Sequence, residues 1–248
     1  METRILLVRL KQRYGETAII QRKTVSSQPD SSALTDMSRF KAALFDLDGV
    51  IFDTEPQYTR FWGSEFRRYY PDRPGLEHAI KGQTLTQIYD KWFSGPLEAE
   101  REPLTARLDA FEAQMDFPYV EGTAAFIEAL RAQGIRTAVV TSSNQPKMSN
   151  VFRKHPEFTA LFDRIVTAED ITHSKPAPDC YLKAAELLGA DPADCIAFED
   201  SFNGLRSAMA AGTTVVALTT AHPASELGEL SHFQIPDYTD ALALLGLR

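Results

Sequence analysis

The sequence is poor in cysteine, in long apolar runs and in positive charge, and each shortage argues against a class of protein. Two of its 248 residues are cysteines, Cys180 and Cys195. Both lie in apolar segments, so we expect buried reduced thiols rather than a disulfide framework or a metal site. No apolar run approaches the ~20 residues that span a bilayer. A formal net charge of −8 disfavours general nucleic-acid binding. We therefore expect a cytoplasmic monomer that binds neither nucleic acid nor membrane.

Residues 1–36 differ in character from the rest of the chain. They hold more basic than acidic residues and end in a Ser- and Pro-rich stretch, 26–32, that is typical of a linker. A transit peptide is one interpretation, although Glu2 and Glu16 count against it. A reading frame that truly starts at Met37 is another. We favour a flexible, dispensable extension, whose deletion should leave fold and turnover unchanged.

From Phe40 onward, continuous apolar runs alternate with segments of helical periodicity. Such runs suit strands of a parallel sheet buried on both faces. The candidate strands are Ala42–Phe45, Thr137–Thr141, Ile165–Thr167, Ile196–Phe198 and Val215–Leu218. Three of the intervening helical segments end at Gly134, Gly189 and Gly212, where a left-handed helix terminus is expected. The order predicts a doubly wound, Rossmann-like α/β fold that binds ligands beyond the carboxyl ends of its strands.

One long segment interrupts this alternation. Residues 56–118 carry helical, aromatic-rich patterns and no convincing strand. A loop of that length is improbable in a compact domain. We therefore expect an inserted α-helical cap, with a catalytic core built from residues 37–55 and 119–248.

The end of the first strand carries a pair of aspartates. Asp46 and Asp48 are two positions apart, so on an extended strand both side chains point to one face. Gly49 then permits a tight turn. Paired carboxylates at this place suit a hard cation and a phosphoryl group, although Asp-x-Asp also occurs in ordinary loops and in metal-dependent transferases. Its meaning depends on the groups at the other strand ends.

Three further polar clusters follow later strands. Thr141, Ser142, Ser143 and Asn144 offer hydroxyl and backbone donors for phosphate oxygens, although any one of them could simply cap a helix. Lys175 lies beside prolines and could neutralise phosphate, or it could be a solvated surface lysine. The Glu199-Asp200 pair follows a buried strand, where carboxylates are costly unless a cation or solvent compensates them. Mg²⁺ fits best, since it takes oxygen ligands and few carboxylates.

Taken together, these four motifs resemble the haloacid dehalogenase superfamily. The resemblance runs from about Phe40 to Leu247, and the helical insert is similar to that of β-phosphoglucomutases, phosphoglycolate phosphatases and sugar-phosphate phosphatases. It implies that Asp46 attacks phosphorus and forms an aspartyl-phosphate, while Asp48 protonates the leaving oxygen and later accepts a proton from water.

The same resemblance implies the ligands of the metal and of the phosphate. Mg²⁺ would be held by Asp46, the backbone carbonyl of Asp48 and Asp200, with Glu199 as a further ligand or as a support for the others. The groups that hold the phosphoryl oxygens would be Thr141, Ser142, Ser143 and Lys175. The cap would close over the site and contact the organic part of the substrate.

These implications favour a Mg²⁺-dependent phosphatase of small phosphorylated metabolites, most of all sugar phosphates. A β-phosphoglucomutase-type mutase is the alternative. Its pattern has a histidine where this chain has Tyr58, and an arginine in the cap turn where this chain has Leu85, although Lys81 or Lys91 could replace that arginine. A non-catalytic binding protein is disfavoured because no motif residue is missing. The turn at residues 81–84 is where we expect the cap to meet substrate.

Overall fold

The fold centres on one parallel β-sheet. The computed structural model describes residues 37–81, 83–239 and 241, so the predictions for residues 1–36 lie outside the described part. The six strands run in the order β3-β2-β1-β4-β5-β6, and every adjacent pair is parallel. Their bounds are Ala42–Phe45 (β1), Arg136–Val140 (β2), Arg164–Val166 (β3), Cys195–Glu199 (β4), Thr214–Leu218 (β5) and Phe233–Ile235 (β6).

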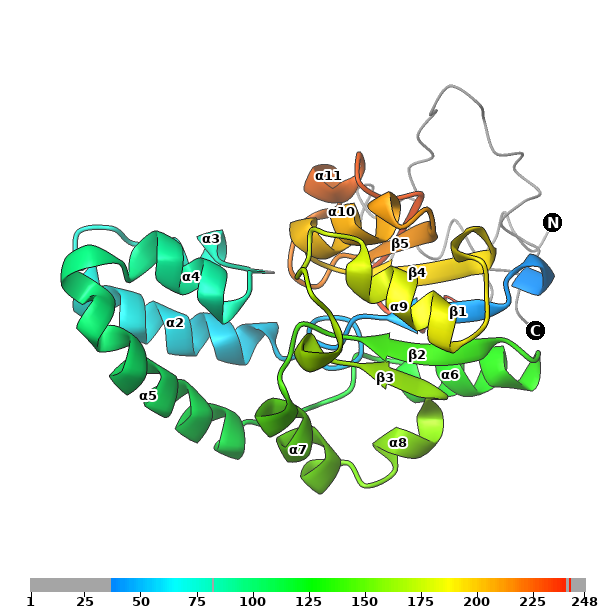
Figure 1. The fold of residues 1–248 in the computed structure, drawn as a ribbon, viewed down its shortest axis with the longest axis horizontal. Coiled ribbons are helices and arrows are strands. Elements are labelled where there is room, and N and C mark those ends of the chain that lie inside the picture. The colour runs from blue at the N-terminus through cyan, green and yellow to red at the C-terminus, as the bar shows by residue number, and fades with distance from the viewer. Residues whose placement is uncertain (1–36, 82, 240, 242–248) are drawn as a thin grey trace.

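Helices cover both faces of this sheet (Figure 1). Phe45 and Phe198 stack with ring centroids 4.7 Å apart on the face packed against α6 (Thr123–Ala132), α7 (Gln145–Lys154) and α8 (Phe158–Leu161). Alternate strand residues pack on the other face against α9 (Asp179–Leu187), α10 (Phe202–Ala210) and α11 (Ala224–Leu227). This is the predicted doubly wound α/β architecture, and burial on both faces explains why the strands are apolar throughout.

A separate helical unit lies between β1 and β2. Its helices are α2 (Glu55–Tyr69), α3 (Leu76–Ala79), α4 (Leu85–Trp92) and α5 (Arg101–Gln114), with a 3-10 helix at Gly95–Glu100. They enclose their own aromatic-rich core, in which Phe66 packs against Trp62, Trp92 and Phe93. The unit lies at the end of the sheet where the strands finish (Figure 1). Because it has its own core, it can pack as a body distinct from the sheet.

Most of the local predictions agree with the structure. Gly134, Gly189 and Gly212 all have positive φ at the ends of their helical segments, and both cysteines are buried and free. The sequence prediction missed β6, and it placed β2 and β3 one residue too far along the chain. Within the described ranges, no helix combines the length and the hydropathy required to cross a membrane.

Candidate active site

Asp46 and Asp48 lie where β1 ends, in a tight turn. The Asp46 N–H donates to the Phe198 carbonyl at 3.0 Å, which extends the sheet pairing by one residue. Gly49 then adopts φ +72°, and its N–H donates to the Phe52 carbonyl at 2.7 Å. A Cβ at Gly49 would lie 1.8 Å from Oδ2 of Asp200, so glycine is required here both by backbone angle and by space.

Lys175 is buried between two carboxylates, and it is not the surface lysine that the sequence left open. Its Nζ lies 2.6 Å from Oδ1 of Asp46 and 2.5 Å from Oε1 of Glu199, and it also donates to the Val140 carbonyl at 3.0 Å. Burial alone would lower the pKa of Lys175, but Asp46 and Glu199 raise it above its usual value. The lysine therefore remains charged.

Glu199 has both oxygens engaged. Oε1 accepts from Lys175 and from the Tyr181 hydroxyl at 2.9 Å, while Oε2 accepts from the backbone N–H of Asp200 and from Ser201. A Cβ at Gly204 would lie 1.8 Å from Oε1, so the start of α10 approaches this carboxylate closely. These contacts orient Glu199 toward Lys175.

Carboxylates outnumber the cation in this buried cluster. Asp46, Glu199 and Asp200 can each offer an oxygen within 4.8 Å of the others. Burial raises the pKa of Asp46 to about 7, with Lys175 opposing the rise and Glu199 adding to it. Burial also raises the pKa of Asp200 well above its usual value. Two buried acids and one half-buried acid with one lysine need further positive charge, so the donor set fits a hard divalent cation.

The loop after β2 presents hydroxyl and amide groups to the same pocket. Thr141 Oγ1 accepts from the Ser143 N–H at 3.0 Å, and Ser143 Oγ donates to Asp48 at 3.3 Å. The helix cap is Asn144, whose side chain accepts from the Lys147 N–H at 3.0 Å. The sequence left a helix-capping role open for four residues, and the structure gives that role to Asn144 and not to Thr141, Ser142 or Ser143.

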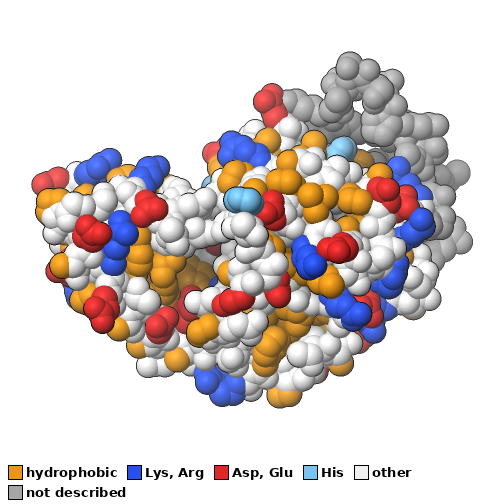
Figure 2. Space-filling model, viewed as in Figure 1, with side chains coloured by type: hydrophobic (Ala, Val, Ile, Leu, Met, Phe, Trp, Pro, Cys, Tyr) orange, Lys and Arg blue, Asp and Glu red, His pale blue; other side chains and the backbone are white. Residues whose placement is uncertain are grey.

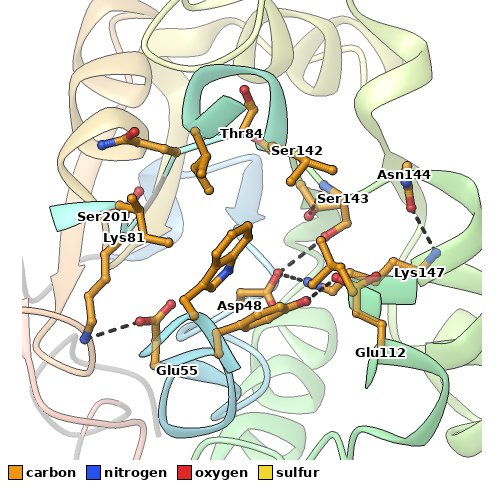
Figure 3. Close-up of a pocket in the computed structure, with 18 of the residues that line it drawn as sticks. Asp48, Glu55, Lys81, Thr84, Glu112, Ser142, Ser143, Asn144, Lys147 and Ser201 are labelled. Carbon is orange, nitrogen blue, oxygen red and sulfur yellow. Dashed lines mark hydrogen bonds and ion pairs between the residues drawn. The ribbon is translucent and has the colours of Figure 1, made fainter. Parts of the chain in front are cut away.

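Asp48 has partners that the sequence analysis missed. Thr54 Oγ1 donates to its Oδ1 at 2.6 Å, and the Lys147 ammonium bonds to its Oδ2 (Figure 3). Nothing in the sequence marks Lys147 except its place in the first turn of α7. Two other site residues were also missed: Tyr181 on α9, whose hydroxyl donates to Glu199, and Thr220, whose hydroxyl donates to the Gly49 carbonyl at 2.6 Å.

The helical unit closes one side of a pocket of about 240 Å³. Figure 2 shows the molecule hollowed between this unit and the sheet. The residues predicted to meet substrate, Lys81, Gln83 and Thr84, line the pocket; Gly82 lies outside the described residues. The Nζ of Lys81 lies 3.3 Å from Oε2 of Glu55 (Figure 3) and donates to the Ala221 carbonyl at 3.0 Å. The pocket therefore joins the motif residues of the core to side chains of the helical unit. The core contributes Asp46, Asp48, Thr141, Ser142, Ser143, Lys175 and Asp200, and the helical unit contributes Glu55, Tyr58, Trp62 and Glu112, among others.

The chain is similar to known proteins of one family. A family profile described as haloacid dehalogenase-like hydrolase matches residues 40–212. Hexitol phosphatase A of Escherichia coli is 32% identical over 196 residues, which cover 77% of this chain and 89% of that protein. Fructose-1-phosphate phosphatase YqaB of E. coli is 28% identical, with 72% and 96% covered. The crystal structure of CbbY from Rhodobacter sphaeroides in complex with phosphate has a TM-score of 0.67 at 26% identity, covering 84% of this chain and 100% of that one.

Proposed function

The chain belongs to the haloacid dehalogenase-like hydrolase family, and we propose that it is a Mg²⁺-dependent phosphatase of sugar phosphates and similar small phosphomonoesters. Its phosphatase relatives support a phosphoric monoester hydrolase as the enzyme class. The observation that carries the proposal is the pocket itself. Asp46 and Asp200, at the ends of β1 and β4, and Lys175, in the loop before α9, all line it.

Asp46 is the proposed nucleophile. Its carboxylate lies beside the ammonium of Lys175, which can also neutralise an incoming phosphoryl oxygen. Attack of an Asp46 oxygen on phosphorus breaks the bond to the alcohol oxygen and leaves an aspartyl-phosphate. Asp48 gives its proton to the departing alcohol, then takes a proton from the water that hydrolyses the intermediate. Free phosphate and the original Asp46 carboxylate result.

The residues that would hold Mg²⁺ are the carboxylates of Asp46 and Asp200 and the backbone carbonyl of Asp48. Bound there, the ion supplies positive charge to the phosphoryl group and its neighbouring carboxylates. Glu199 is saturated by its bonds to Lys175, Tyr181 and backbone N–H groups, so of the two roles left open for it we favour the supporting one.

The loop after β2 is the proposed phosphate cradle. Thr141 Oγ1, the backbone near Ser142 and Ser143, and Lys175 surround the place beside Asp46 where equatorial oxygens would lie. Fixed donors of this kind provide most of the catalysis in phosphoryl transfer, because the enzyme mainly positions groups and stabilises charge. These residues should therefore affect turnover more than stability.

Residues 56–118 are proposed to act as a cap that contacts the organic part of the substrate. Direct contacts already join this unit to the core: Gln87 Nε2 donates to the Lys175 carbonyl at 3.3 Å, and Lys81 reaches Ala221. Tyr58 and Leu85 stand where the mutase pattern has a histidine and an arginine. The Tyr58 hydroxyl donates to Glu112 at 2.7 Å, so it is engaged within the helical unit, and neither Tyr58 nor Leu85 supplies the positive charge that the mutase pattern has in the cap turn. This favours hydrolysis over isomerisation.

A panel of phosphate esters tests the proposal. The purified protein should release inorganic phosphate from hexose or hexitol monophosphates; EDTA should abolish the release and added Mg²⁺ should restore it. The mutase alternative is tested with β-glucose 1-phosphate and catalytic glucose 1,6-bisphosphate, where we expect free phosphate and little glucose 6-phosphate. Rapid glucose 6-phosphate formation without free phosphate would establish the mutase instead.

A further inference from the structure

Lys147 is a buried cation at the boundary between the cap and the core. It is the third residue of α7 and is only 5% exposed. Its Nζ bonds to Oδ2 of Asp48 and lies 4.7 Å from the centre of the Tyr58 ring. A lysine this deeply buried is costly unless its charge is compensated. Both of its partners belong to the pocket, one to the core and one to the cap.

In the cap, Lys147 contacts Tyr58, and Tyr58 is itself held by Glu112. Tyr58 on α2 donates its hydroxyl to Oε1 of Glu112 on α5 at 2.7 Å, so the ring that faces Lys147 is fixed by a second cap helix. Burial raises the pKa of Glu112 and the positive charge of Lys147 opposes that rise, which indicates that the two groups attract each other. A continuous path therefore leads from Glu112 through Tyr58 and Lys147 to Asp48.

The Asp48 carboxylate is held from two directions. Thr54 Oγ1 donates to one oxygen at 2.6 Å, while Lys147 and Ser143 donate to the other. Thr54 and Ser143 are neutral, so Lys147 alone brings positive charge among these three. As Asp48 transfers its proton to the leaving oxygen, negative charge develops on its carboxylate. A fixed ammonium beside that carboxylate stabilises the developing charge.

We propose that Lys147 is a positioning residue for Asp48, and that Tyr58 and Glu112 hold Lys147 in place when the cap lies against the core. The proposal rests on the proposed role of Asp48 as the group that protonates the leaving oxygen. It assigns to Lys147 no contact with the phosphoryl group. Its effect should therefore depend on whether the leaving group needs a proton.

Two substrates separate this role from a structural one. A sugar phosphate releases an alkoxide that needs the Asp48 proton, whereas p-nitrophenyl phosphate releases a nitrophenolate that leaves without it. The ratio kcat/KM reports the steps up to formation of the phosphoenzyme, so hydrolysis of the intermediate does not obscure the comparison. Lys147→Met should lower kcat/KM about 10- to 100-fold for the best sugar monophosphate of the panel, and much less for p-nitrophenyl phosphate.

Two further lysine variants complete this test. Lys147→Arg keeps the charge and should recover part of the sugar-phosphate activity. Lys183→Met, at a lysine that is paired with Glu186 on the exposed side of α9, is the matched control and should leave both activities unchanged. Equal losses on both substrates, or no loss on either, from a Lys147→Met protein with cooperative melting would overturn the proposal. Should Lys147→Met fail to fold, Lys147→Arg serves as the test. Its kcat/KM should then fall below that of the wild type for the sugar phosphate and stay unchanged for p-nitrophenyl phosphate.

The cap part of the path has its own test. Tyr58→Phe keeps the ring but removes the bond to Glu112, so it should cause a smaller loss with the same substrate dependence. An unchanged ratio between the two substrates in Tyr58→Phe would overturn the cap part. Asp48→Asn distinguishes this inference from the proposed function. If Asp48→Asn keeps the wild-type kcat/KM for the sugar phosphate, the proposed role of Asp48 is wrong. If Asp48→Asn loses that activity but the Lys147 variants keep it, the role of Asp48 stands and the positioning role of Lys147 is wrong.

Discussion

Lys175 Nζ lies 2.6 Å from Oδ1 of Asp46, although 129 residues separate them in the sequence. The contact brings the loop before α9 against the end of β1 and places the cation beside the proposed nucleophile. The ammonium is buried and compensates acidic side chains that the fold keeps away from water. Lys175 should therefore matter to stability as well as to catalysis.

Lys175→Met should destabilise the protein and abolish turnover. Removing one partner of a buried charge pair typically costs about 3–5 kcal/mol, because the remaining charge is left uncompensated. Thermal melting and denaturant titration measure the loss, with Lys183→Met as the exposed control. A Lys175→Met protein as stable as the wild type would show that the acids here do not depend on this lysine.

Gly49→Ala should inactivate the enzyme, whereas Gly134→Ala should not. Both glycines have positive φ, so both alanine variants should lose about 1–2 kcal/mol of stability. At Gly134 a Cβ meets nothing within 4 Å, but at Gly49 it would lie 1.8 Å from Oδ2 of Asp200. The clash must displace the proposed metal ligand. Melting temperatures and phosphate release of the two variants separate the backbone effect from the site effect, and an active Gly49→Ala protein would refute the tight packing of this turn.

Mg²⁺ should raise the melting temperature of the wild type but not of Asp200→Asn. A ligand that binds the folded state stabilises it in proportion to the logarithm of its concentration over its dissociation constant. Asp200 is one of the three acids whose oxygens cluster within 4.8 Å. A thermal shift assay with increasing MgCl₂ checks this without relying on activity. Equal shifts in both proteins would place the ion elsewhere.

Without metal, the protein should become less stable as pH rises from about 4 to about 7. Burial raises the pKa of Asp46 from 3.8 to about 7, so in this window the folded state binds more protons than the unfolded state. Stability therefore falls with increasing pH across the window and levels off above it. Melting temperatures in EDTA across this range measure the trend, and Asp46→Asn should make the slope shallower, while Asp200, whose pKa burial also raises, keeps a slope of the same sign. A metal-free protein that grows more stable toward pH 7 would contradict this electrostatic account.

The sheet was largely predictable because its strands are buried on both faces, and continuous apolar runs such as Ala42–Phe45 record that burial. β6 escaped prediction since it has three residues and Gln234 interrupts it. The strand-end motifs pointed to the pocket because parallel strands bring their carboxyl ends to one edge. Lys147 could not be found in this way. Its partner Asp48 is 99 residues distant, and only the folded chain brings the first turn of α7 beside the loop after β1.

The most direct test of the account is the chemical state of Asp46 during turnover. Asp48→Asn should slow hydrolysis of the intermediate, so this variant, mixed with p-nitrophenyl phosphate and quenched in acid, should accumulate a phosphoenzyme. Peptide mass spectrometry should place the phosphoryl group on Asp46, and Asp46→Asn should show neither the modification nor more than a trace of wild-type turnover while melting cooperatively. Phosphorylation of another residue, or full turnover by Asp46→Asn, would contradict the central claim.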